Sequence, residues 1–258
     1  MGGASLATVL KSLFTILGCL TPATIIYALA TDGFPFRKEV LIPLLVLTRI
    51  DIYIHVFIIG WWVVYKESNW TSAVLWVVLL VCLGSVATCV YIVLQFLKLS
   101  TQESLQDPIY FVLLRRHKKT ETEQQRKCCM LTARILSLAL GSLMLGAFSY
   151  YWVTYGSPIS RDDLTPWMIE TNTDFLVNGV AFSVWIAYKE SSWLTAAILI
   201  ILLNFVSGSV ITCAYIAVHL FNLSSQDPVY LVLFNSRNRK ENEDMKEPLK
   251  QTAWEGVN

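Results

Sequence analysis

Two aspartates inside apolar segments are the residues of this sequence best placed for chemistry. Asp51 is followed four positions later by His55. Asp174 is followed four positions later by Asn178. Residues four apart lie on the same face of a helix, and an aspartate near the centre of a bilayer costs about 2.5 to 3.5 kcal/mol on insertion scales. Each carboxylate is therefore expected to face the protein interior, to be paired, or to bind something.

These four residues allow two interpretations. In the first, all four side chains converge at an interface and bind a proton, a cation or a polar solute. In the second they are structural: Asp51 pairs with Arg49 or His55, and Asp174 accepts a hydrogen bond from a neighbour on its own helix. Neither a metal nor a cofactor is expected, because the sequence has no helical doublet of metal ligands and no Gly-rich phosphate loop.

The composition predicts the environment of the protein that contains these residues. Of the 258 residues 55% are hydrophobic and 15% charged, with a mean hydropathy of +0.52. A soluble domain of this length would need more charge on its surface. The net charge of +1 excludes the broad basic excess that a nucleic-acid partner requires. We therefore expect a multi-pass integral membrane protein in a lipid bilayer, without an assignment to a particular membrane.

The sequence consists of two similar halves. A shift of 123 positions aligns Asp51 with Asp174, and Lys66-Glu67-Ser68 with Lys189-Glu190-Ser191. Such self-similarity indicates a duplicated structural unit. Apolar segments long enough to cross a bilayer predict three helices in each half, at residues 8–30, 42–65, 71–97, 130–152, 166–188 and 194–221.

Three spans per half predict that the second half enters the membrane from the opposite face. The expected fold class is an all-α polytopic membrane bundle of six transmembrane helices, arranged as two three-helix repeats in inverted topology. The expected domains are residues 1–114, the first repeat with an interfacial segment; 115–129, a basic linker; 130–234, the second repeat with an interfacial segment; and 235–258, a disordered polar tail.

A short apolar segment follows the last span of each half. It begins with Asp107-Pro108 in the first half and Asp227-Pro228 in the second. Aspartate is a good helix N-cap and proline suits the first helical position. A short interfacial helix is predicted at each place, acting either as a gate over the bundle or as an anchor at the membrane surface.

Two adjacent cysteines are candidates for lipid attachment. Cys128 and Cys129 follow Arg126-Lys127 at the start of the fourth predicted span. Cysteines next to a membrane are sites of S-palmitoylation. The alternative is a pair of unmodified thiols.

Three tracts of the second half carry a resemblance to a known family. They are Tyr188-Lys189-Glu190-Ser191-Ser192-Trp193, the Gly-Ser-Val-x-Thr-Cys-x-Tyr-Ile segment ending at Ile216, and Ser225-Gln226-Asp227-Pro228. They resemble a family of plant multi-pass membrane proteins catalogued as a domain of unknown function, over essentially the whole chain. The resemblance implies the membrane class and brings no activity, substrate or catalytic residue.

Three functions follow from these observations. The favoured one is a carrier for a small solute or an ion, with the paired acids as a midplane site. The second is an intramembrane enzyme acting on a lipid or isoprenoid, in which Asp51 and His55 would exchange protons. The third is a non-catalytic scaffold. Besides lipid, the partners considered are a small solute or cation and a second copy of the chain.

Overall fold

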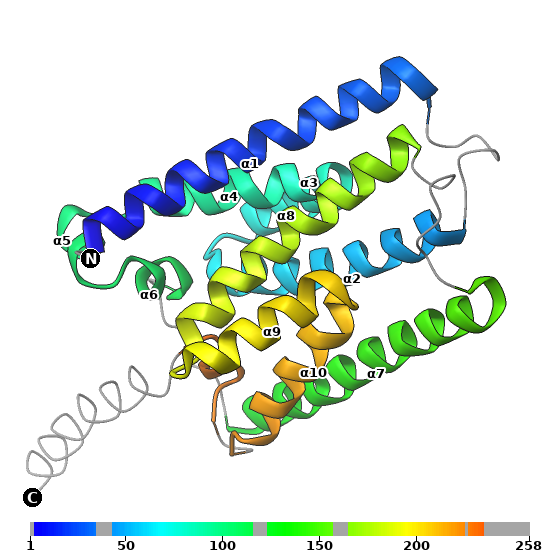
Figure 1. Cartoon of the computed structure of the whole chain (residues 1–258). Helices are drawn as coiled ribbons and strands as arrows, with labels where there is room; N and C mark the ends of the chain where they lie inside the picture. The colour runs from blue at the N-terminus through cyan, green and yellow to red at the C-terminus, as the bar shows by residue number, and fades with distance from the viewer. Residues whose placement is uncertain (1–2, 35–42, 116–122, 157–164, 225–226, 235–258) are drawn as a thin grey trace, which may run out of the picture.

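The computed structural model describes residues 3–34, 43–115, 123–156, 165–224 and 227–234. These residues contain helices and no strand, so the expected all-α class is confirmed for them (Figure 1). The elements are α1 (Gly3–Asp32), α2 (Pro43–Lys66), α3 (Trp70–Leu83), α4 (Ser85–Leu97), α5 (Thr101–Gln106), α6 (Pro108–Leu113), α7 (Glu123–Tyr155), α8 (Pro166–Lys189), α9 (Trp193–Phe205), α10 (Gly208–Phe221) and the 3-10 helix η2 (Val229–Leu233). We call α1 to α6 the first half and α7 to η2 the second half.

Among the described residues, three helices are long and apolar enough to cross a membrane: α1, α2 and residues Cys128–Tyr155 of α7. The expectation of six such helices is wrong for two reasons. Helix α8 matches α2 in length, at 24 residues, but is less apolar because it carries buried polar side chains. The expected spans at 71–97 and 194–221 are each broken into two shorter helices.

The break between α3 and α4 reverses the direction of the chain. Gly84 at the break has a φ of 54°, a left-handed conformation that glycine adopts without a Cβ clash. The Tyr91 ring of α4 packs on the Trp76 ring of α3, with centroids 4.9 Å apart. The Tyr91 hydroxyl also donates a hydrogen bond to Glu67, just before α3, at 2.9 Å. Helix α4 therefore runs back along α3, and the two form a hairpin.

Helices α9 and α10 form a second hairpin. The chain reverses at Val206 and Ser207. The Tyr215 hydroxyl of α10 donates to Glu190, just before α9, at 2.5 Å. The ring of Trp185 packs edge-to-face on Tyr215, with centroids 5.4 Å apart. Each hairpin therefore starts and finishes at the end of the molecule where α2 and α8 finish.

Helices α1 and α8 run in opposite directions. At one end, the Trp167 indole at the start of α8 donates to the carbonyl of Gly33 after α1, at 3.0 Å. At the other end, the Tyr188 hydroxyl of α8 donates to Asp107 before α6, at 3.2 Å. This second end also holds the N-terminus of α1 and the short helix α5 (Figure 1).

Helices α1 and α7 run in the same direction, and so do α2 and α8. Tyr151 near the end of α7 shares a buried cluster with Leu47 near the start of α2. The C-terminal ends of helices α1 and α7 accordingly lie on the same side of Figure 1. The expected inverted arrangement of the halves is therefore wrong. The reason is that the third element of each half is a hairpin, which returns the chain to the end where that half began.

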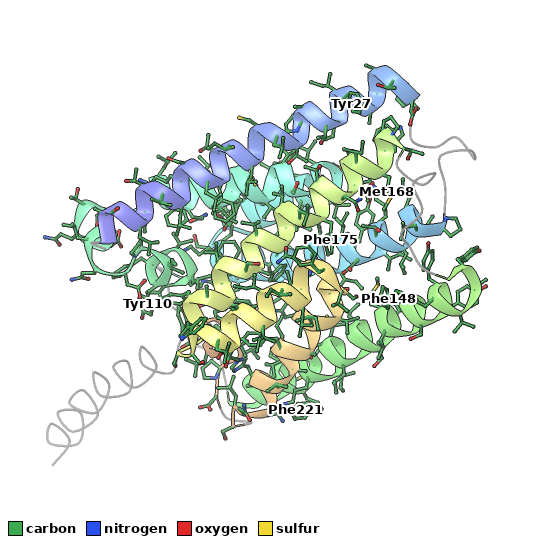
Figure 2. All side chains as sticks on the ribbon, in the orientation of Figure 1. Tyr27, Tyr110, Phe148, Met168, Phe175 and Phe221 are labelled. Atoms are coloured by element: carbon green, nitrogen blue, oxygen red, sulfur yellow. The ribbon has the colours of Figure 1, made fainter. Side chains whose placement is uncertain are left out.

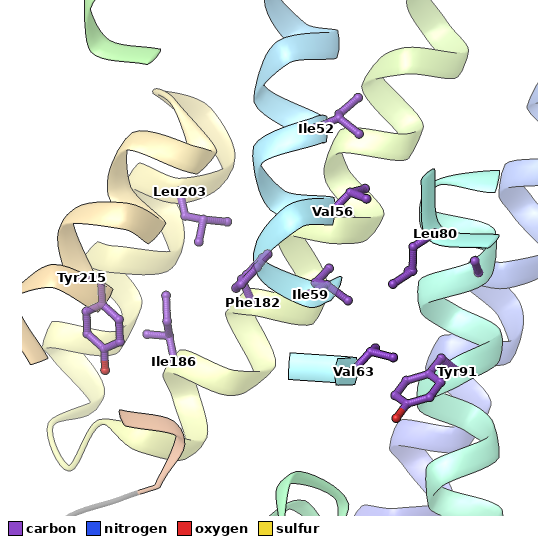
Figure 3. Packing of buried hydrophobic residues seen from close by; sticks show 11 residues of the cluster. Ile52, Val56, Ile59, Val63, Leu80, Tyr91, Phe182, Ile186, Leu203 and Tyr215 are labelled. Atoms are coloured by element: carbon purple, nitrogen blue, oxygen red, sulfur yellow. The ribbon is translucent and has the colours of Figure 1, made fainter. Parts of the chain in front are cut away.

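A central core cluster holds the hairpins against α2 and α8 (Figure 3). Val63 of α2 and Ile186 of α8 are fully buried in it. Leu80 and Tyr91 come from the first hairpin, and Leu203 comes from the second. Outside this core, α1 packs on α4 and α8, while α7 packs on α10 and α2. The interface between α2 and α8 is thus enclosed by both hairpins.

The predicted short helix after the first hairpin is confirmed as α6. The Asp107 carboxylate accepts a hydrogen bond from the Tyr110 amide at 3.1 Å, and Pro108 takes the first helical position. The second copy is the 3-10 helix η2. Helix α7 begins inside the range expected to be a linker, with Cys128 exposed and Cys129 half-buried in its first turns. Their acylation stays a prediction, and the 235–258 tail lies outside the described residues.

Candidate functional site

Each of the two acids binds the tip of the hairpin in the other half. Asp51 of α2 accepts a hydrogen bond from the backbone N–H of Ser209 in the first turn of α10, at 2.7 Å. Asp174 of α8 accepts one from the backbone N–H of Ser85 in the first turn of α4, at 2.8 Å. The first N–H groups of a helix lack partners within it and favour negative charge. Both acids therefore stabilise helix starts that the chain reversals create inside the protein.

The residues one turn further along α2 and α8 contact the same two hairpins. His55 Nε2 lies 3.2 Å from Thr212 Oγ1 in α10. Thr88 of α4 donates a hydrogen bond to Asn178 Oδ1 at 3.1 Å, and the Asn178 amide donates to the Asp174 carbonyl at 3.1 Å. The four predicted site residues thus form two pairs, one at each hairpin tip.

Arg49 pairs across the α2–α8 interface. Its guanidinium forms an ion pair with Glu170 of α8, whereas the sequence had offered Asp51 as its partner. The residue aligned with Arg49 is Asn172, and the residue aligned with Glu170 is Leu47. Each member of the pair therefore lacks a charged counterpart in the other half. That shared asymmetry was the signal by which the pair could have been found.

The end of the interface near Arg49 is closed. A cluster of side chains there is at most 5% exposed, and it consists of Ala28, Leu45, Trp167 and Met168. Figure 2 shows Met168 at this end and Tyr110 at the opposite end of the helices. An ion pair and an apolar cluster therefore seal the starts of α2 and α8 together.

A cavity of about 520 Å³ lies toward the other end of the same interface. It is lined by α2 and α8 together with parts of α4, α7, α10, α6 and η2. Thr88, Phe182 and Cys213 line it near the hairpin tips. Ser68 and Trp70, which are exposed, line it at the far end. Its volume falls within the range of small-molecule sites. The interface is thus closed at one end and hollow at the other.

The wall of this cavity is mostly apolar and aromatic. Among its few polar groups, the Trp62 indole N–H and the Arg115 Nε–H are buried and have no hydrogen-bond partner among the described residues. Both Glu67 oxygens are already bonded, to Tyr91 and to Ser72. Buried donors without acceptors are costly. The wall therefore favours a guest with an apolar body and oxygen acceptors.

None of the four predicted site residues lines the cavity. They lie directly behind its wall: Thr88, which bonds Asn178, and Phe182, whose ring centroid is 4.8 Å from that of His55, are both lining residues. Among the residues that the structure describes, no group of three His, Cys, Asp or Glu side chains could hold a metal ion. Thr88 and Phe182 therefore separate the cavity from the buried polar residues.

The hydrogen bonds that join each hairpin to the turn before it were not predicted from the sequence. Glu67 binds Tyr91 in the first half, and Glu190 binds Tyr215 in the second. All four residues lie in tracts that align between the halves. A glutamate and a tyrosine retained at matched positions in both halves were the available signal.

A family model matches residues 1–240 of the chain, and its description reads "Protein of unknown function (DUF1475)". The chain therefore belongs to this family. No curated protein and no solved structure matches it. The family match extends over both hairpins, the cavity and the closed end, and it supplies no activity.

Proposed function

We propose that the chain is a multi-pass integral membrane protein made of two repeated halves in parallel orientation. In each half, two long helices cross the membrane and the hairpin enters and returns on the same side. Large apolar side chains exposed on the outer faces support this, among them Ile16 of α1 and Leu143 of α7, with 67% and 59% of their surfaces exposed. Such faces suit contact with lipid.

Helix α8 is included among the spanning helices because its polar side chains point inward. Glu170, Asp174 and Asn178 are at most 4% exposed. Buried and paired polar groups are the kind that membrane helices tolerate. The hairpin tips are compatible with membrane depth for the same reason, since non-helical backbone is accepted there when it is buried in protein.

The function that the geometry supports best is carriage of a small solute by alternating access. The observation that carries this is the asymmetry along the α2–α8 interface. The cavity occupies one end, while the Arg49–Glu170 ion pair and the apolar cluster close the other. In a carrier, parts of the repeat interface open and close in turn around a site near the membrane centre. This conformation corresponds to a carrier closed at the Arg49 end.

The wall of the cavity defines the class of solute. An apolar body fits the aromatic lining, and oxygen acceptors would satisfy the donors of Trp62 and Arg115. The two acid pairs form a polar layer behind this wall. An intramembrane enzyme receives less support, because Asp51 and Asp174 are bonded to helix starts and neither lines the cavity.

Removal of the ion pair tests the carrier proposal. The variant Arg49→Gln/Glu170→Gln is combined with reporter cysteines, in a background where the native cysteines are alanine. Met168→Cys reports the closed end and Ala133→Cys reports the cavity. Without the ion pair we expect a water-soluble maleimide to label residue 168 about tenfold faster, a factor that corresponds to about 1.4 kcal/mol. Labelling at residue 133 should slow in the same variant.

The charge-swapped variant Arg49→Glu/Glu170→Arg is the matched control. It restores an ion pair across the same interface, and labelling at both reporters should return toward the original rates. Two outcomes contradict the carrier proposal. One is faster labelling at both reporters together, which indicates a loosened fold. The other is no change at either reporter.

A further inference from the structure

The two hairpin tips differ in how completely their buried polar atoms are bonded. At the α4 tip, both polar atoms of the Asn178 side chain make hydrogen bonds. The Ser85 hydroxyl lies 3.3 Å from the Thr21 hydroxyl. This tip has the bonding of a structural joint, in which buried polar groups satisfy one another.

The α10 tip retains buried atoms without protein partners. They are His55 Nδ1, Ser207 Oγ and Ser209 Oγ, each without a hydrogen-bond partner among the described residues. His55 and Ser209 have no exposed surface, and Ser207 is 5% exposed. The difference arises from three exchanges between the aligned halves. Histidine stands where the other half has Asn178, Met144 stands where the first half has Thr21, and Ser207 stands where the first half has Leu83.

The bonding of Thr212 determines which nitrogen of His55 carries the proton. The Thr212 hydroxyl donates its single hydrogen to the Gly208 carbonyl at 2.9 Å. We therefore assign the hydroxyl as the acceptor at the 3.2 Å contact with His55, which places the proton of the neutral ring on Nε2. In the neutral ring, Nδ1 then carries a lone pair. That lone pair is buried, and no donor reaches it among the residues that the structure describes.

We propose that His55 Nδ1 is a proton-binding site. The proton adds to the Nδ1 lone pair, the Nε2–H bond stays intact, and the ring becomes an imidazolium. The Asp51 carboxylate, four residues earlier on the same helix, provides the counter-charge. Ser207 and Ser209 are the chain neighbours of Gly208, which packs on the ring. A hydroxyl can donate to the neutral ring and accept from the charged one.

A proton fits this site better than a larger guest. A Cβ atom on Gly208 would lie 2.5 Å from His55 Cε1, so the start of α10 already touches the ring. The rings of Phe175 and Phe182 pack on His55 as well, with centroids 6.1 and 4.8 Å away. None of the three atoms without partners belongs to a residue that lines the cavity. Proton binding needs no additional volume.

The other charged and titratable groups on the packed helices have assigned partners or are uncharged. Arg49 and Glu170 neutralise each other, and Asp174 caps α4. Lys66 of α2 donates to the Phe111 carbonyl, Lys189 of α8 donates to the Val232 carbonyl, and His219 of α10 lies 3.6 Å from the Glu190 carboxylate. Asp51 thus remains the anion assigned to His55.

Proton binding at His55 can affect the solute cavity through the Phe182 side chain. The Phe182 ring contacts His55 on one side and lines the cavity on the other. A charge on His55 therefore acts directly behind the wall. A role of this proton in driving carriage rests on the proposed function, whereas proton binding itself does not.

Nitrogen NMR of the full-length protein in lipid nanodiscs tests the site. The chain has three histidines, His55, His117 and His219, and His117→Gln and His219→Gln assign the signals. Between about pH 4 and pH 9, we expect the Nδ1 signal of His55 to change from the unprotonated to the protonated form. The signal should be absent in His55→Asn, which introduces the amide that the other half carries at the aligned position.

Two matched variants test the counter-charge. Asp51→Asn keeps an oxygen for the Ser209 amide while removing the charge, and it should weaken proton binding at His55 by about tenfold or more. Asp174→Asn makes the same change at the other tip and should leave His55 unaffected. A His55 ring that stays neutral throughout the titration overturns the proposal, and so do equal effects of the two variants. Because no solute is involved, either result is independent of the carrier proposal.

Discussion

Asp51 and Asp174 work as helix caps supplied by one half of the chain to the other. Each accepts a backbone N–H from the first turn of a hairpin helix whose start is buried. A buried N–H that loses its acceptor costs about 1 to 3 kcal/mol. The acceptor oxygen, more than the negative charge, is therefore the feature on which the hairpin tips depend for stability.

Substitution at the two acids separates the acceptor from the charge. We expect Asp51→Ala and Asp174→Ala each to lower the free energy of unfolding by about 1 to 2 kcal/mol, because an N-cap acceptor is lost. Asp51→Asn and Asp174→Asn keep an acceptor and should stay within about 0.5 kcal/mol of the original protein. Denaturant titration in detergent measures the difference. Asparagine variants as unstable as the alanine variants would show that the charge itself is required.

The sequence predicted that these acids face the protein interior. It also predicted that His55 and Asn178 lie on the same helix faces as the acids. It could not identify their partners, because those partners are backbone groups exposed only by the reversals at Gly84 and Ser207. In the sequence, residues 71–97 form one apolar segment of spanning length. Nothing in its hydropathy separates a spanning helix from two half-length helices that turn back.

The two hairpins are the elements that determine the architecture. Each is anchored to the polar turn before it, by Tyr91 on Glu67 and by Tyr215 on Glu190. The sequence correctly indicated a tight polar turn at both places. It did not indicate that the following helix returns to that turn, because this contact joins residues on opposite sides of the chain reversal.

The first hairpin depends on glycine at its tip. A Cβ atom on Gly84 would lie 2.8 Å from Asp174 Oδ2, and its φ is 54°. We expect Gly84→Ala to destabilise the protein by more than about 1 kcal/mol, because the left-handed backbone and the cap are both disturbed. Thermal denaturation in detergent measures this effect.

Gly146→Ala is the control for the glycine substitution. Gly146 lies inside α7, and a Cβ atom there would meet nothing within 4 Å. Alanine in a helix interior is more stable than glycine by about 1 kcal/mol, so this variant should be neutral or stabilised. Equal behaviour of the two variants would contradict the assigned role of Gly84.

At the scale of the whole molecule, the parallel direction of the halves explains why one end is closed and the other hollow. The starts of α2 and α8 meet at Arg49 and Glu170, and residues of their later turns line the cavity. The sequence did yield the similarity of its two halves and the approximate extents of α1, α2 and α8. It did not yield the direction, because direction depends on whether the third element of each half crosses or returns.

The measurement that tests this account most directly is the sidedness of four single cysteines in sealed vesicles, in a background lacking the native cysteines. Phe34→Cys and Tyr155→Cys lie at the ends of α1 and α7, while Ser68→Cys and Ser191→Cys follow α2 and α8, all at exposed positions. An impermeant maleimide should label residues 34 and 155 from one side and residues 68 and 191 from the other. Labelling of residues 34 and 155 from opposite sides would contradict the parallel arrangement. It would also contradict the proposed carrier, which has its closed end on one side of the membrane and its cavity toward the other.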